Sequence, residues 1–136
     1  MQKNIIETTE APAAIGPYSQ AVKAGNLIFL SGQIPLDPKT GNLITTGIED
    51  ETHRVMKNIE AILEAANISF HNIIKTTIFL KSMDDFARVN SIYASYFTGN
   101  FPARETVEVS GLPKGARIEI SIVASVDWIF KMKIEE

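Results

Sequence analysis

Residues 101–121, FPARETVEVSGLPKGARIEIS, contain two stretches in which polar and apolar side chains alternate, joined by a turn rich in glycine and proline. A period of two is typical of β-strands, whose successive side chains point to opposite faces of a sheet. In the first stretch Arg104 and Thr106 share one face, and Glu105 takes the other. In the second, Glu119 lies opposite an apolar row of Ile118, Ile120, Ile122 and Ala124. We therefore predict two strands, each holding a charged side chain in a fixed position.

Arg104 and Glu119 have the chemistry of a small-anion site. A guanidinium is a planar fork of donors that matches a carboxylate or a phosphate with two hydrogen bonds at once. A nearby glutamate can position a water molecule. Spacing alone leaves a second interpretation open, because most charged side chains on strand faces are solvated or form weak surface pairs.

The absence of cysteine limits the chemistry of this 136-residue chain to oxygen and nitrogen groups. His53 and His71 are far apart in the sequence and have no carboxylates at ligand spacing, so we expect neither a metal site nor a cofactor. The net charge of −3 and the lack of a basic stripe argue against a nucleic-acid partner.

Length and the lack of repeats or linkers predict one domain spanning residues 1–136. The N-terminal residues have no apolar core of signal-peptide length, and no apolar run approaches a membrane span. We therefore expect a cytoplasmic protein that does not bind a membrane.

Periodicity and turn residues predict the remaining elements. Residues 46–49 fit a capping box at the start of an amphipathic helix, with Asn67 as its left-handed cap. Ser82 with Asp85 is expected to cap a second helix, which ends at Gly99. We predict an edge strand at residues 3–7 and a hairpin formed by residues 19–23 and 27–31. A central strand buried on both faces is predicted at residues 73–80, and a last strand at residues 117–126.

These elements predict an α+β fold, with a single mixed sheet of about six strands and two helices on one face. The order strand, helix, strand across residues 73–109 implies a crossover to a parallel neighbour. Two helices cover only one face of such a sheet. Because the other face also carries apolar residues, we expect it to be buried against copies of the same chain.

Several motifs in a fixed order resemble the Rid family, the reactive intermediate deaminases. The resemblance covers about residues 5–126. Its motifs read APAAIGPYSQAV, FLSGQIPLDPKTG, VMKNIEAILEAAN, KTTIFLKSMDDFARVNSIYASYF, FPARETVEV and LPKGARIEISIVAS. The resemblance implies a trimeric, chorismate-mutase-like fold with sites between subunits. It also implies hydrolysis of 2-iminobutanoate and 2-iminopropanoate, or their enamine forms, to 2-oxo acids and ammonia, as a defence against metabolite damage.

The resemblance also assigns site residues. Arg104 corresponds to the family's carboxylate-binding arginine, and Glu119 to the glutamate thought to hold the attacking water. The positions that match the pocket lining are Tyr18, Ser31, Gly32, Asn90 and Thr106. Three features depart from the common pattern, namely Glu105, Ser121 and an extended tail at residues 127–136.

Two other functions stay open at this point. Members of the family have been described as endoribonucleases that inhibit translation, although the acidic charge of this chain does not favour RNA binding. A regulatory protein that only binds small carboxylates would need Arg104 but would tolerate loss of Glu119. That difference separates a sensor from a deaminase.

Overall fold

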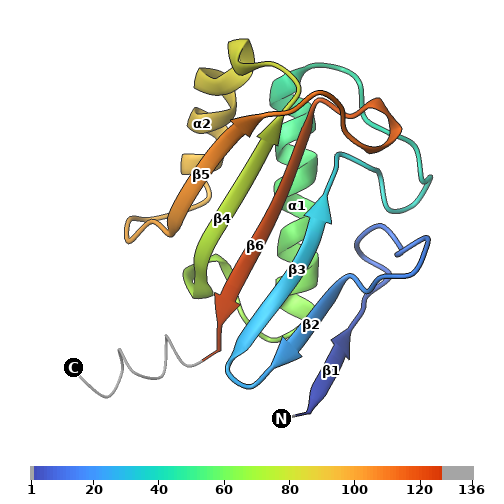
Figure 1. Cartoon of the computed structure of the whole chain (residues 1–136), viewed down its shortest axis with the longest axis vertical. Helices are drawn as coiled ribbons and strands as arrows, with labels where there is room; N and C mark the ends of the chain where they lie inside the picture. The colour runs from blue at the N-terminus through green and yellow to red at the C-terminus, as the bar shows by residue number, and fades with distance from the viewer. Residues whose placement is uncertain (1, 127–136) are drawn as a thin grey trace.

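The computed structural model describes residues 2–126 and contains one six-stranded sheet with two helices on one face (Figure 1). This arrangement confirms the predicted α+β class. The elements are β1 (Lys3–Ile6), β2 (Ala21–Ala24), β3 (Leu27–Gln33), α1 (Ile48–Ala65), β4 (Ile73–Leu80), α2 (Phe86–Ala94), β5 (Ala103–Glu108) and β6 (Ile118–Ser125). Within the described residues, no helix is both long and apolar enough to cross a membrane.

The strand order in the sheet is β1-β2-β3-β6-β4-β5. Strands β4 and β5 are parallel, as the crossover through α2 predicted, and all other pairs are antiparallel. Strands β5 and β6, which carry Arg104 and Glu119, are consecutive in the sequence but are not neighbours in the sheet, because β4 lies between them. The charges on β5 and β6 are therefore separated by a full strand.

Helix α1 supplies much of the core, with Val55, Met56, Ile59 and Ile62 each at most 1% exposed. The predicted capping box is wrong. Gly47 is the N-cap and makes no side-chain capping bond, while the Thr46 hydroxyl donates to the Asp50 carboxylate at 2.8 Å. Asn67, at φ 61°, does adopt the left-handed conformation that was predicted to end the helix.

Helix α2 is shorter than predicted and ends at Ala94, five residues before Gly99. The Ser82 hydroxyl caps the preceding 3₁₀ turn η2 (Met83–Asp85), where it accepts the Asp84 amide at 3.2 Å. Asp85 is the N-cap of α2 but caps nothing with its side chain. Its carboxylate instead accepts a hydrogen bond from the Arg88 guanidinium, which removes it from capping.

The two faces of the sheet differ in burial, and we refer to them as the helix-covered face and the open face. Alternate residues of β4 are buried under the helices, whereas Thr77 and Phe79 are only half-buried, so the prediction that β4 is buried on both faces fails for the single chain. The open face exposes Ile5, Phe29 and Val107 by 51%, 47% and 41%. Nothing within residues 2–126 covers these apolar side chains.

Candidate functional site

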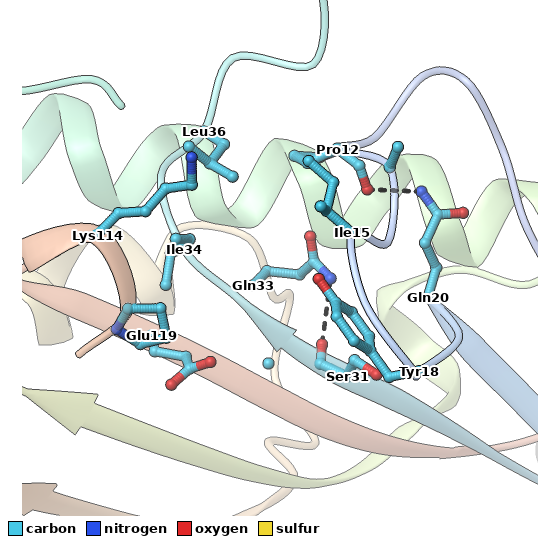
Figure 2. A pocket seen from close by; sticks show the side chains of 13 residues that line it. Pro12, Ile15, Tyr18, Gln20, Ser31, Gln33, Ile34, Leu36, Lys114 and Glu119 are labelled. Atoms are coloured by element: carbon cyan, nitrogen blue, oxygen red, sulfur yellow. Dashed lines mark hydrogen bonds between the residues drawn. The ribbon is translucent and has the colours of Figure 1, made fainter. Parts of the chain in front are cut away.

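A pocket of about 550 Å³ lies where β3 and β6 meet the loops before β2, after β3 and before β6 (Figure 2). We call it the Glu119 pocket. Its walls are largely apolar, with Ile15, Ile34 and Leu36 among the lining side chains. Two charged residues, Glu119 and Lys114, also line it. The remaining lining residues are Pro12, Ala13, Tyr18, Gln20, Ser31, Gly32, Gln33 and Pro113.

Glu119 projects from β6 and is packed against the backbone of Gly32 on β3. A Cβ built at position 32 would lie 2.3 Å from the Oε2 atom of Glu119, far inside contact distance. Burial raises the pKa of the Glu119 carboxyl above its ordinary value of 4.5, because a charged form is disfavoured where water is partly excluded. A carboxylate with a raised pKa is a stronger base once it is ionised, as a group that takes a proton from water needs to be.

A buried amide holds the N-terminal wall of the pocket. Gln20, 4% exposed, accepts the amide of Thr8 at 2.7 Å and donates to the carbonyls of Thr8, Ala11 and Pro12. These four bonds fix the loop that leads to Tyr18. The Ser31 hydroxyl adds a bond of 2.6 Å to the Ser19 carbonyl, so its proton is already committed and only its oxygen can accept a bond from a ligand.

Two further polar contacts hold the opposite walls. Asn58 of α1 is fully buried and donates to the carbonyls of Ile34 and Leu36 at 3.3 and 3.0 Å. Arg117 forms a two-bond pair with Glu51, whose side chain is 2% exposed, and this pair anchors the chain between the turn and β6. Each wall of the pocket is thus held by hydrogen bonds to a buried side chain, which is how a loop keeps a defined shape.

Arg104 lies elsewhere, between β5 and α2. Its guanidinium carbon is 5.2 Å from the ring centroid of Tyr93 and 5.8 Å from that of Phe86. Aromatic faces attract a cation without consuming its donors. No ion pair of Arg104 forms among residues 2–126, so its hydrogen-bonding fork has no carboxylate partner within this part of the chain.

Two further polar side chains, Thr106 and Asn90, belong to the two elements that flank Arg104, β5 and α2. The Thr106 hydroxyl is buried and has no hydrogen-bond partner among the described residues. Such a group costs stability unless something bonds it. Asn90 occupies the same face of α2 as Phe86 and Tyr93, because residues three and four apart are neighbours on a helix.

Glu105 does not oppose Arg104. It lies on the open face, where its carboxylate pairs with Lys75 at 3.0 Å and accepts a bond from the Thr77 hydroxyl at 3.0 Å. The bond from Lys75, followed by the one from Thr77, lowers the pKa of Glu105. Ser121 pairs in register with Thr77 and is half-buried on the same face. The tail at residues 127–136 lies outside the described residues.

The sheet register places Arg104 and Glu119 on opposite faces. Arg104 is level with Thr76, which is buried on the helix-covered face, whereas Glu119 is level with Phe79 on the open face. The structure therefore brings Tyr18, Ser31, Gly32 and Glu119 together in one half-site. Arg104 and Thr106, on the other face of the sheet, form a second half-site beside α2, the helix that also carries Asn90. One molecule cannot bridge both half-sites within a single chain, because the sheet separates them.

Lys114 is a pocket residue that reasoning from the sequence missed. It belongs to the turn η3 (Pro113–Gly115), and only its closeness to Glu119 along the chain pointed to the pocket. Ile34 and Leu36 were missed for a different reason. They follow β3 in a proline-rich turn, where no periodicity indicates which side chains face inward. Their orientation depends on Asn58, which is distant in sequence.

Comparisons with known proteins agree on one group. The family described as "Endoribonuclease L-PSP" matches residues 8–126. A RutC family protein of Pyrococcus horikoshii is 55% identical over 122 residues, covering 90% of this chain and 97% of the relative. The 2-iminobutanoate/2-iminopropanoate deaminase of Mus musculus is 48% identical over 122 residues, 90% of each chain. The crystal structure of YyfA, a Rid-family protein of Yersinia pestis, superposes with a TM-score of 0.90 at 52% identity, covering 92% of this chain and 100% of the other.

Proposed function

This chain belongs to the Endoribonuclease L-PSP family, which includes the Rid proteins, and from that premise we propose that it is a 2-iminobutanoate/2-iminopropanoate deaminase. The proposed reaction is hydrolysis of a 2-imino acid, or of its enamine form, to a 2-oxo acid and ammonia. Relatives that carry this name in Mus musculus and Homo sapiens are 48% and 49% identical to the chain. The proposed setting is the cytoplasm.

The observation that carries the proposal is the separation of two complementary half-sites. Among residues 2–126, Glu119 has a raised pKa and no cation beside it in the pocket other than Lys114, whereas Arg104 forms no ion pair and lies on the opposite face from Glu119. Hydrolysis of an imino acid needs both groups on one substrate. We therefore assign Arg104 of one subunit and Glu119 of the next to the same site, in a cleft between copies.

The open face of the sheet supports such an assembly. Ile5, Phe29 and Val107 lie on three different strands and are each exposed by more than 40%. An apolar surface that extends across a sheet is typically buried in a symmetric oligomer. The proposed state is a homotrimer, with one site in each of its three clefts and no nucleic acid as a partner.

In the proposed mechanism the substrate carboxylate accepts two hydrogen bonds from the Arg104 guanidinium. The Thr106 hydroxyl and the Asn90 amide contribute polar contacts in the same half-site. Glu119 orients a water molecule toward the imine carbon, and Tyr18, Ser31 and Gly32 line the side from which it approaches. The substrate thus lies between the two half-sites.

The chemical steps follow from the acid and base at hand. The water oxygen attacks the carbon of the protonated imine while Glu119 takes a proton from the water. The resulting carbinolamine regains that proton on nitrogen. The C–N bond then breaks as the hydroxyl proton of the carbinolamine passes to the Glu119 carboxylate, so that ammonia and a 2-oxo acid are released. An iminium carbon is already electrophilic, so the steps require no covalent nucleophile.

A coupled assay tests the proposal. Threonine dehydratase releases 2-iminobutanoate from threonine, and the purified protein should speed disappearance of the imine above its spontaneous rate. Wild-type protein that leaves this rate unchanged would overturn the assignment.

A further inference from the structure

Within the part of the chain that the structure describes, Lys114 is the one cation that lines the Glu119 pocket. Figure 2 shows it on the far side of the pocket from Tyr18, with its side chain directed toward Leu36. Lys114 is exposed, and it forms no ion pair among residues 2–126. In the same part of the chain, four other cations pair with carboxylates: Lys57, Lys75, Arg88 and Arg117.

Glu119 does not make use of the Lys114 charge. An ammonium group close enough to neutralise a carboxylate lowers its pKa. The pKa of Glu119 is instead raised, and burial is the cause. The positive charge of Lys114 is therefore available to a ligand that enters the pocket.

The backbone holds Lys114 in a fixed and uncommon conformation. Its φ of 58° and ψ of 18° are left-handed, a region that residues other than glycine seldom adopt. The Ala116 amide donates to the Pro113 carbonyl at 3.1 Å, and the Arg117–Glu51 pair anchors the chain that follows. Glycine or asparagine would suit this conformation better than lysine. The backbone therefore gives no reason for a lysine here, whereas its place in the pocket does.

We propose that Lys114 binds a second carboxylate and that the pocket accepts 2-imino acids with an acidic side chain. This inference rests on the proposed function, in which Arg104 of a neighbouring copy holds the first carboxylate. Ile34 and Leu36 lie on the same side of the pocket as Lys114, where they can contact the methylenes between the two acidic groups. The imine derived from glutamate has two such methylenes. Its hydrolysis follows the same balance, in which one water is consumed and one ammonia released.

The test compares two substrates on the same variants. 2-Iminobutanoate is generated by threonine dehydratase, and 2-iminoglutarate by an oxidase acting on glutamate. We expect the wild-type protein to hydrolyse both. Lys114→Met should lower kcat/KM for 2-iminoglutarate about tenfold more than for 2-iminobutanoate, because only the former loses a charge-assisted bond. Lys114→Arg should restore the wild-type ratio of kcat/KM for 2-iminoglutarate to kcat/KM for 2-iminobutanoate. Higher ionic strength should lower this ratio in the wild-type protein.

Lys57→Met is the matched control, because it removes an exposed lysine of α1 outside the pocket and changes the net charge equally. It should leave the ratio of kcat/KM for the two substrates unchanged.

Calorimetry with the products 2-oxoglutarate and 2-oxobutanoate gives a readout that is independent of turnover. An equal loss for both ligands in Lys114→Met, or a wild-type protein that acts only on 2-iminobutanoate, would overturn the inference and leave the proposed function standing. A wild-type protein that hydrolyses neither imine would overturn both.

Discussion

The backbone of Gly32 and the carboxylate of Glu119 are in such close contact that no other residue fits at position 32 without moving the acid. A Cβ there would lie 2.3 Å from Oε2, 2.7 Å from the carboxyl carbon and 2.9 Å from Cγ of Glu119. The backbone at Gly32 is not in the left-handed region, so glycine is required by space and not by conformation. Strand β3 therefore sets the position of the proposed base on β6.

Gly32→Ala is expected to displace the Glu119 carboxylate and lower kcat/KM for 2-iminobutanoate about ten- to a hundredfold, since a shift of about 1 Å in a reacting group has that effect. Gly111→Ala is the matched control, because a Cβ there meets nothing within 4 Å and the backbone is not left-handed. Thermal unfolding should show both variants folded. Full activity in Gly32→Ala would mean that the position of Glu119 is not critical.

The roles of Arg104 and Glu119 separate in binding and in turnover. Arg104→Lys keeps the charge but loses the fork, and should cost about 1.5 to 3 kcal/mol, or roughly ten- to a hundredfold in kcat/KM. Arg104→Ala should also abolish binding of the product 2-oxobutanoate. Glu119→Gln should keep the product bound while slowing hydrolysis about a hundredfold or more, because an amide is a poor base.

Calorimetry with 2-oxobutanoate, run beside the imine assay, measures both effects. Equal and large losses of affinity for 2-oxobutanoate in Arg104→Ala and in Glu119→Gln would show that Glu119 binds the substrate and does not activate water. Intact binding with no imine hydrolysis even in the wild-type protein would favour the regulatory, carboxylate-binding function.

The raised pKa of Glu119 predicts a pH dependence of both rate and stability. The base must be ionised, so kcat/KM should fall as the pH drops through a value above 4.5, and this acid limb should disappear in Glu119→Gln. The free energy of unfolding depends on pH in the opposite sense to the rate. Because the folded state holds the proton more tightly than the unfolded state, the contribution of Glu119 is present at low pH and is lost as the pH rises through the folded pKa.

The difference in unfolding free energy between Glu119→Gln and wild type should therefore shift in favour of the variant between pH 4 and pH 7. Denaturant unfolding at the two pH values measures it. A shift in the other direction would show that the carboxylate is stabilised in its charged form, contrary to the effect of its burial.

The acidic balance of the chain predicts that RNA is not a substrate. With a net charge of −3, the purified protein should neither cleave RNA nor bind it with a strong salt dependence. Incubation with single-stranded RNA at two salt concentrations checks this. Cleavage that survives purification and vanishes in Arg104→Ala would instead support the activity after which the family is described.

Much of the fold could be predicted from the sequence, because its signals are local. The alternation in residues 118–125 placed β6, and the left-handed Asn67 marked the end of α1. Helix caps were less predictable, because the side chains of Thr46 and Asp85 bond to other side chains, Asp50 and Arg88, and not to backbone amides of the helices. Local spacing also could not place the site. Arg104 and Glu119 lie on opposite faces because of the register in which β5 and β6 each pair with β4, and that register depends on pairing across distant segments.

The proposed division of the site between subunits makes a prediction that a single-chain site would not. Light scattering should give a mass of about three times 15.0 kDa for the wild-type protein. Arg104→Ala and Glu119→Gln are each expected to be nearly inactive as pure proteins. When the two variants are mixed, unfolded and refolded together, about a quarter of the clefts should combine an intact Arg104 from one chain with an intact Glu119 from another. Imine hydrolysis should then recover to about a quarter of the wild-type rate.

The control for complementation is a pair of variants from the same half-site. Glu119→Gln mixed with Gly32→Ala leaves every cleft with a damaged Glu119 side, because both positions lie in one pocket of one chain. This mixture should give no more activity than the average of its two components. Recovery in the control but not in the Arg104 and Glu119 mixture, or a monomer at micromolar concentration, would contradict the shared site. It would leave Lys114, within the same pocket as Glu119, as the cation that receives the substrate carboxylate.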